Sequence, residues 1–122
     1  NSPTSIVGKK AEYAPNQIIR TGVEYKYNII AISYQIQYNS SCFSDAANTI
    51  TPNNAATVGL IPANVIHDAA FNITLNDSYN LKAGFNNLLN TVSIMRRTAG
   101  YPGPGALSNQ GRSFYMSFTV KF

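Results

Sequence analysis

Two adjacent arginines, Arg96 and Arg97, are the residues of this 122-residue chain best suited to bind a small anion. A guanidinium group presents its N–H donors as a planar fork, which pairs with a carboxylate through two parallel hydrogen bonds. Tyr101 lies a few residues further on, and its ring could pack against a bound molecule. Gln37 is a polar candidate from a separate part of the chain. These four residues are the candidate ligand contacts, and ordinary loop or wall positions are the alternative for each.

The remaining reactive side chains are too few and too scattered to build a catalytic or metal centre. The five acidic residues fall on different predicted elements, with no acid pair beside a base and no Ser-His-Asp order. One histidine, His67, and one cysteine, Cys42, argue against a structural zinc site and exclude an internal disulfide. Cys42 could pair with a cysteine outside the chain or remain a free thiol. We therefore predict that the chain is not an enzyme and holds no metal or covalently bound cofactor.

Composition favours a β protein with an unusual surface. Hydrophobic residues make up 44% of the chain and charged residues only 11%, against about 25% charged in an ordinary soluble domain. This apolar content, with a net charge of +4, excludes intrinsic disorder. The nine lysines and arginines are scattered, so we expect no nucleic-acid partner. Low charge with many Asn, Ser, Thr and Tyr residues suits a β protein whose outer face does not meet water.

Strict alternation of apolar and polar side chains predicts five strands. In the last nine residues, every second residue from Phe114 to Phe122 is apolar, and the residues between them are mostly polar. The same pattern recurs four more times. The predicted strands cover residues 19–27, 30–38, 65–75, 79–86 and 114–122. Each strand therefore has one apolar face and one polar face.

The connections between these strands alternate between short and long. Asn28 and at most one more residue separate the first two strands, and residues 76–78 separate the third and fourth, which indicates tight hairpins. The other two connections, residues 39–62 and 87–111, are long. Short turns at one end and long loops at the other are typical of a transmembrane β-barrel. A strand of this length, tilted by about 45°, crosses about 21 Å, which fits an apolar band of about 25 Å.

Five strands cannot close such a barrel, because membrane barrels have at least about eight strands. An open sheet edge is not tolerated in lipid. We therefore expect residues 1–122 to be the C-terminal part of a larger barrel whose earlier strands precede them. The alternative is a soluble β-sandwich or small barrel with the apolar face as its core, but the two long loops leave little chain for a second sheet.

The order of these motifs resembles the C-terminal strands of TonB-dependent outer-membrane receptors. Residues 80–88, Asn-Leu-Lys-Ala-Gly-Phe-Asn-Asn-Leu, are similar to the penultimate strand of that family, and residues 111–122 are similar to its final strand. Residues 13–17 resemble one of its extracellular loops. The pattern departs from the family at residues 89–95, where an acidic residue and a tyrosine are usual.

A narrower resemblance is carried by residues 96–105, which read Arg-Arg-Thr-Ala-Gly-Tyr-Pro-Gly-Pro-Gly, together with residues 43–49 and 58–63. These segments look like the ferric citrate (iron(III) dicitrate) receptor subgroup. The resemblance implies a barrel of about 22 strands, plugged by an N-terminal domain that is absent here. Such a receptor takes up a ferric chelate across the bacterial outer membrane. The TonB complex pulls on the plug, and no covalent chemistry takes place.

The resemblance also implies roles for particular residues and partners. Chelate contacts would come from Arg96, Arg97, Tyr101 and Gln37, although the arginines could instead lie in solvent or contact lipopolysaccharide. A C-terminal signal for the barrel assembly machinery would comprise Phe118, Val120 and Phe122. Other implied partners are ferric citrate or another siderophore, the TonB complex, and outer-membrane lipid. A passive porin-like or structural barrel and a small secreted β binding module are the alternatives.

Overall fold

The structure is a computed structural model that describes residues 5–121. This part of the chain contains only β-strands, turns and irregular segments, which confirms the predicted all-β fold. The described residues include no helix that is long and apolar enough to cross a membrane. The strands are β1 (Ile18–Tyr27), β2 (Ile30–Asn39), β3 (Cys42–Phe43), β4 (Leu60–Ile61), β5 (Asn64–Asn76), β6 (Tyr79–Asn86), β7 (Ile94–Thr98), β8 (Gly105–Ser108) and β9 (Ser113–Val120).

The chain forms two compact units, each assembled from separate stretches of sequence. Within the described residues, the sheet unit consists of residues 19–38, 65–91 and 110–121. The loop unit consists of residues 5–18, 39–64 and 92–109. Each unit is described separately below.

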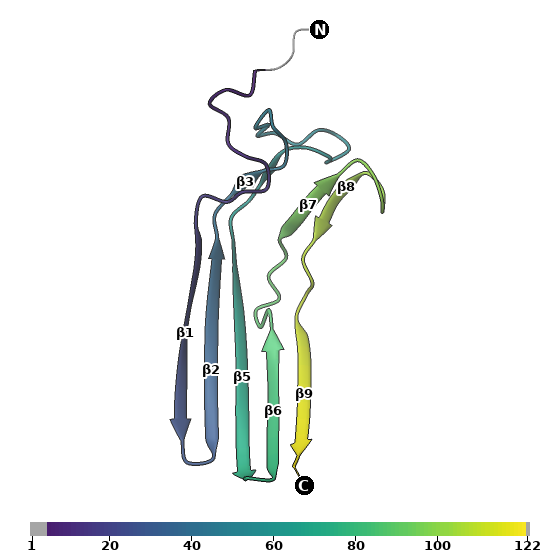
Figure 1. The fold of residues 1–122 in the computed structure, drawn as a ribbon. Helices are drawn as coiled ribbons and strands as arrows, with labels where there is room; N and C mark the ends of the chain where they lie inside the picture. The colour runs from purple at the N-terminus through teal and green to yellow at the C-terminus, as the bar shows by residue number, and fades with distance from the viewer. Residues whose placement is uncertain (1–4, 122) are drawn as a thin grey trace. The chain divides into compact units, whose positions relative to one another are not determined.

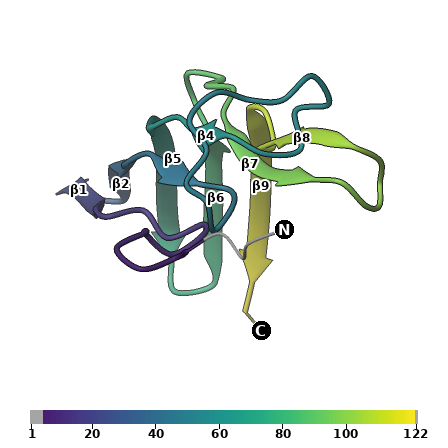
Figure 2. The same cartoon turned by 90° about the horizontal axis from the view of Figure 1, so that it is seen from above.

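The sheet unit is a five-stranded sheet in the order β1-β2-β5-β6-β9. Neighbouring strands run in opposite directions (Figure 1), and the view from above shows the same order across the sheet (Figure 2). All five strands predicted from the alternation are therefore confirmed, with ends that differ by at most two residues. Phe122, predicted to end the last strand, lies outside the described residues.

Tight turns join the strands of each hairpin in the sheet unit. Only Asn28 and Ile29 separate β1 from β2, and Asn28 has a φ of 50°, a left-handed conformation that asparagine tolerates better than most residues. At the second turn, the Asn76 side-chain oxygen accepts hydrogen bonds from the backbone N–H groups of Ser78 and Tyr79, at 2.9 and 3.0 Å. Such an Asx turn, in which an asparagine side chain binds backbone N–H groups that follow it, is a common turn structure. The two short connections predicted from the sequence are thus confirmed.

The apolar face of the sheet unit is uncovered. Ile32 is 53% exposed, Met116 67% and Phe118 59%. Ile61 and Ala83 are the only buried hydrophobic residues in the described part of the chain. Side chains on this face contact one another along the sheet, as where the Phe118 ring stacks on that of Tyr79 at a centroid distance of 6.2 Å. The described residues thus provide no core beneath the apolar face, unlike a soluble sandwich.

On the polar face of the sheet unit, the neighbouring strands approach Gly84 closely. Gly84 lies opposite Ala70 on β5 and Tyr115 on β9. A methyl group at Gly84 would lie 2.7 Å from the Ala69 carbonyl oxygen and 2.7 Å from the Tyr115 hydroxyl oxygen. The tyrosine side chain therefore occupies the space that a residue larger than glycine would need.

The loop unit corrects one expectation from the sequence. Residues 39–62 and 87–111, predicted as loops without strands, contribute two short antiparallel pairs, β3 with β4 and β7 with β8. Cys42 lies opposite Ile61 in the first pair. Alternation cannot reveal strands of two residues, and the β7 pattern is interrupted by a shift in register between Ile94 and Arg96.

A buried serine secures the long segment between β3 and β4. The Ser44 hydroxyl donates to the Gly59 carbonyl oxygen and accepts from the Gly59 N–H, both at 2.9 Å. Ser44 is 7% exposed. Gly59 has a φ of 131°, and a methyl group there would lie 2.9 Å from the Pro52 Cα atom. The loop unit is thus organised by individual side-chain hydrogen bonds rather than by a long series of backbone hydrogen bonds between strands.

Candidate ligand-binding site

The β7–β8 hairpin places the two candidate arginines in different environments. Arg96 pairs with Leu107 and Arg97 with Ala106. The register shift before Arg96 is a β-bulge, which redirects side chains from their regular alternation. As a result Met95 and Arg96 are both exposed, whereas Arg97 is buried. Of the two guanidinium groups, that of Arg96 is the one presented to solvent.

The Arg97 side chain is engaged by backbone carbonyls of the loop unit. Nη1 donates to the Ala56 carbonyl oxygen at 3.1 Å, and Nη2 donates to that of Leu60 at 3.2 Å. The carbonyl oxygen of Arg97 accepts a hydrogen bond of 2.7 Å from the Tyr13 hydroxyl. The ligand contact predicted for Arg97 remains a prediction. The hydrogen bonds show that Arg97 also has a structural role within the loop unit.

Tyr101 lies at the tip of the same hairpin and is 98% exposed. The turn that carries it is shaped by glycines, because Gly103 and Gly105 have φ values of 146° and 148°, which other residues rarely adopt. The Gly103 N–H donates to the Gly100 carbonyl oxygen at 2.7 Å. The hairpin therefore presents Tyr101 on a defined turn, with Arg96 on its β7 strand.

Gln37 belongs to the other unit. It lies on β2 and is half-buried. The structure thus brings Arg96, Arg97 and Tyr101 together on one hairpin and places Gln37 in the sheet unit. The ligand contact predicted for Gln37 stays a prediction.

The loop unit carries uncompensated positive charge. Its cations are Lys9, Lys10, Arg96 and Arg97, and its acids are Glu12 and Asp45. The Asp45 carboxylate accepts hydrogen bonds from Thr49, including one of 2.8 Å from the hydroxyl. Between residues 5 and 121 the one ion pair joins Glu24 to Lys26, in the sheet unit. Arg97 is buried, but the other three cations are exposed, and a surface with net positive charge favours an anionic ligand.

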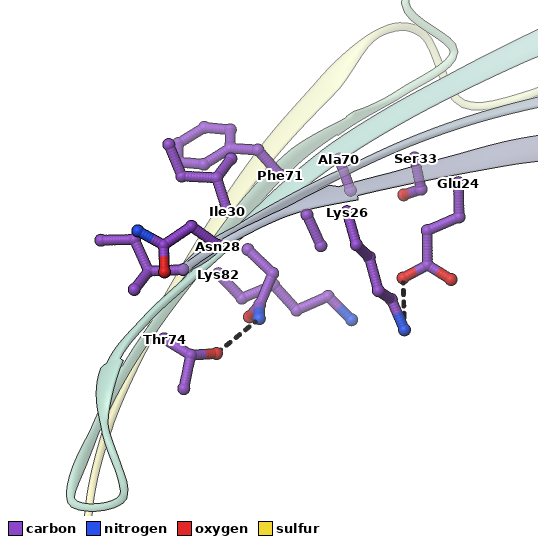
Figure 3. Close-up of a pocket in the computed structure, with 12 residues that line it drawn as sticks. Glu24, Lys26, Asn28, Ile30, Ser33, Ala70, Phe71, Thr74 and Lys82 are labelled. Atoms are coloured by element: carbon purple, nitrogen blue, oxygen red, sulfur yellow. Dashed lines mark hydrogen bonds and ion pairs between the residues drawn. The ribbon is translucent and has the colours of Figure 1, made fainter.

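The polar face of the sheet unit forms an open hollow (Figure 3). The Lys26 Nζ atom lies 3.3 Å from a carboxylate oxygen of Glu24, and the Asn72 amide donates to the Thr74 hydroxyl at 3.2 Å. Lys82 projects from β6 on the same side of the sheet as these groups, whereas Phe71 projects from the opposite side. The hollow is polar and suits contact with water or with another polar surface.

The lone histidine and the lone cysteine have ordinary surroundings. His67 Nδ1 and the Tyr34 hydroxyl are hydrogen-bonded at 2.6 Å. No cluster of acidic, cysteine or histidine residues within residues 5–121 could hold a metal ion. Cys42 is half-buried on β3, and this burial raises the pKa of its thiol. Neither residue is part of a chemical centre in the described chain.

Two asparagines with a clear structural role were not predicted. Asn87 is 4% exposed, and its amide nitrogen donates to the carbonyl oxygens of Thr91 and Gln110, at 2.9 and 3.1 Å. Asn90 accepts a hydrogen bond of 2.9 Å from the Arg112 N–H. Both asparagines have positive φ, 51° and 54°. Asn90 lies in the stretch where the sequence departs from the expected pattern and Asn87 lies just before it, and each asparagine adopts the left-handed conformation there.

The residues of the expected assembly signal lie on the last described strand. Phe118 and Val120 are exposed on the apolar face of β9, and Phe122 is outside the described residues. Recognition of these residues by assembly machinery stays a prediction.

The comparisons with known proteins show first what kind of fold this is. No protein-family profile and no curated protein sequence matches the chain. Solved structures do match it over almost its whole length. The ferric citrate transporter FecA, in its unliganded form, superimposes on 91% of this chain with a TM-score of 0.83 and 24% sequence identity.

Two further solved structures have the same relation to the chain. The siderophore receptor PiuA from Acinetobacter baumannii matches 94% of it, with a TM-score of 0.76 and 21% identity. The ferric-catecholate import receptor Fiu from K12 E. coli matches 91%, with a TM-score of 0.72 and 16% identity. This chain covers only 17%, 15% and 15% of the three proteins. The likeness establishes that most of this chain has the fold of one segment of these solved transporters and receptors.

Proposed function

We propose that this chain is the C-terminal part of an outer-membrane receptor that takes up an iron chelate by TonB-dependent active transport. The observation that carries the proposal is the match of nearly the whole chain to segments of three proteins whose names describe iron-chelate transport or binding. The uncovered apolar face of the sheet unit supports it, because a surface of this kind suits lipid better than water.

We further propose that the transported ligand is ferric citrate or a similar anionic chelate. The positive loop unit supports an anionic ligand, and the hairpin that carries Arg96 and Tyr101 offers both an exposed cationic fork and an exposed aromatic ring. The family resemblance of residues 96–105 favours citrate among the iron chelates.

The test uses the full-length polypeptide that contains this chain, in isolated outer membranes and in intact cells. Radioactive ferric citrate should bind the membranes and accumulate in cells, and a protonophore should abolish accumulation but not binding. Accumulation of a catecholate chelate instead would retain the receptor and replace the ligand. Passive entry of unrelated solutes, unaffected by the protonophore, would favour the porin alternative. A polypeptide extracted without detergent would favour the secreted module.

A matched pair of variants tests the proposed contact. Arg96→Ala should raise the dissociation constant for ferric citrate by about tenfold or more, since a charged hydrogen bond contributes roughly 1.5–3 kcal/mol. Arg20→Ala removes an exposed arginine from the sheet unit and should leave the constant unchanged. Equal constants for the two variants would remove Arg96 from the site.

A further inference from the structure

Arg97 is a buried cation without a carboxylate partner. Its side chain and backbone are 6% exposed, and no ion pair involves it within residues 5–121. Its Nε atom is buried and has no hydrogen-bond partner in the described chain. Burying a charge is costly unless it is paired and hydrogen-bonded, so a residue kept in this state calls for a specific reason.

The contacts of Arg97 supply that reason, because they join three separate segments of the loop unit. Its Nη1 and Nη2 atoms bind the Ala56 and Leu60 carbonyl oxygens in the segment between β3 and β5. Its carbonyl oxygen accepts from Tyr13, in the segment before β1. Arg97 itself is part of the β7–β8 hairpin. One residue thus connects stretches that lie far apart in the sequence.

The guanidinium geometry is well suited to this connection. The two carbonyls lie on either side of Gly59, whose N–H and carbonyl oxygen both bond to the buried Ser44 hydroxyl. A planar fork with fixed N–H directions can hold two such acceptors at once, whereas the ammonium of lysine is a point charge on a flexible stem. Arg97 and Ser44 together therefore hold the segment from Ala56 to Leu60 through three of its residues.

We propose that Arg97 is a positioning residue for the ligand surface of the loop unit. It holds the segment around residues 56–60 and the segment around Tyr13 to the hairpin, and so fixes the backbone that presents Arg96. Its unneutralised charge adds to the positive potential that attracts an anion. The part of this inference that concerns the ligand rests on the proposed function, whereas the assembly of the loop unit does not.

The first measurement is hydrogen–deuterium exchange of residues 52–60 in the full-length polypeptide in outer-membrane vesicles, without ligand. Arg97→Ala should speed exchange in this segment by at least tenfold. Arg97→Lys, which keeps the charge but not the fork, should also speed it. Arg96→Ala is the matched control and should leave exchange unchanged. Unchanged exchange in Arg97→Ala, or wild-type exchange in Arg97→Lys, would overturn the proposal. If Arg97→Ala fails to insert, the lysine variant alone decides.

Chemical rescue separates a positioning role from general damage. Millimolar ethylguanidinium should slow the exchange of Arg97→Ala towards the wild-type rate, and ethylammonium at the same concentration should not. Equal effects of the two cations would contradict the claim that the planar guanidinium group of Arg97 is required. Ferric citrate binding is then measured on the same samples, where Arg97→Ala should weaken it about tenfold and ethylguanidinium should restore it. Absence of binding by the wild type would defeat the proposed function while leaving the exchange result valid.

Discussion

The sheet unit and the loop unit are each stabilised internally by a different kind of interaction. The sheet unit consists of long antiparallel strands whose backbones form a continuous ladder, and its apolar side chains are exposed. The loop unit has strands of two to five residues, and buried polar groups on Ser44 and Arg97 organise it. The difference indicates that stability in the sheet unit is spread over many equivalent bonds, whereas in the loop unit a few side chains carry much of it.

The comparison has a consequence for substitutions. In the sheet unit the loss of stability on substitution should depend on the face on which the residue lies, because every position has similar backbone hydrogen bonds. In the loop unit the hydrogen bonds of the individual side chain should decide. Four predictions test this difference.

The largest effect is expected from a charge on the apolar face in the middle of β9. Met116→Lys should lower the free energy of unfolding by about 2–4 kcal/mol if this face meets lipid near the midplane. Ser117→Lys changes the adjacent residue, which faces the opposite side, and should cost much less. Urea unfolding of the full-length polypeptide in lipid vesicles measures both. Equal losses would remove the assignment of the two faces.

The next effect tests whether the ladder tolerates added volume. Gly84→Ala should destabilise by up to about 3 kcal/mol, because the new methyl group would meet the Ala69 carbonyl oxygen and the Tyr115 hydroxyl, each at 2.7 Å. Gly100→Ala in the loop unit is the control, since the nearest atom to its methyl group would be 3.9 Å away. The same unfolding experiment applies, and a neutral Gly84→Ala would show that Tyr115 can move aside.

A smaller and more local effect is expected in the loop unit. Ser44→Ala leaves the N–H and carbonyl oxygen of Gly59 without their partner, which should cost about 1–2 kcal/mol. The loss should appear as faster hydrogen exchange at the Gly59 amide, with the sheet unit unaffected. Ser108→Ala, at an exposed position on β8, serves as the control. A loss spread over both units would contradict the division drawn between them.

The smallest effect concerns reactivity rather than stability. Burial raises the pKa of the Cys42 thiol, so the thiolate is disfavoured and alkylation by iodoacetamide should be slow at neutral pH. The rate should rise with pH to a midpoint above that of an exposed thiol introduced by Ser108→Cys in a Cys42→Ser background. A midpoint at or below that reference would contradict the raised pKa. No reaction without a reductant would indicate a disulfide to a cysteine outside this chain.

The sequence predicted the sheet unit well because its signal is periodic. The alternation from Phe114 onward marks one strand without any knowledge of its partners, and Asn76 marks a turn by its own chemistry. The loop unit gave no such signal. The pairing of Cys42 with Ile61 spans a long insertion, and the bulge before Arg96 disturbs the alternation of β7. Whether an arginine would be exposed or buried was therefore not predictable from the sequence.

The same limit applies to the candidate site. Two adjacent arginines and a tyrosine could be identified by type, and the structure places all three on one hairpin. The division of labour between Arg96 and Arg97 depends on carbonyl groups of Ala56 and Leu60, which are distant in sequence. Every residue has a backbone carbonyl, so the residue type does not indicate which carbonyl accepts a hydrogen bond. The acceptors of Arg97 could therefore not be predicted from the sequence.

The amide of Asn87 has a consequence for the segment that follows it. It binds the carbonyl oxygens of Thr91 and Gln110, which are the two residues that flank residues 92–109. Together with the hydrogen bond from the Arg112 N–H to Asn90, this amide ties the departing and returning chains to each other within the sheet unit. We expect that a segment anchored in this way could be replaced by another of different length while the strands on either side keep their register. Residues 92–109 are in that sense a cassette, a segment whose two ends are fixed by side chains that lie outside it.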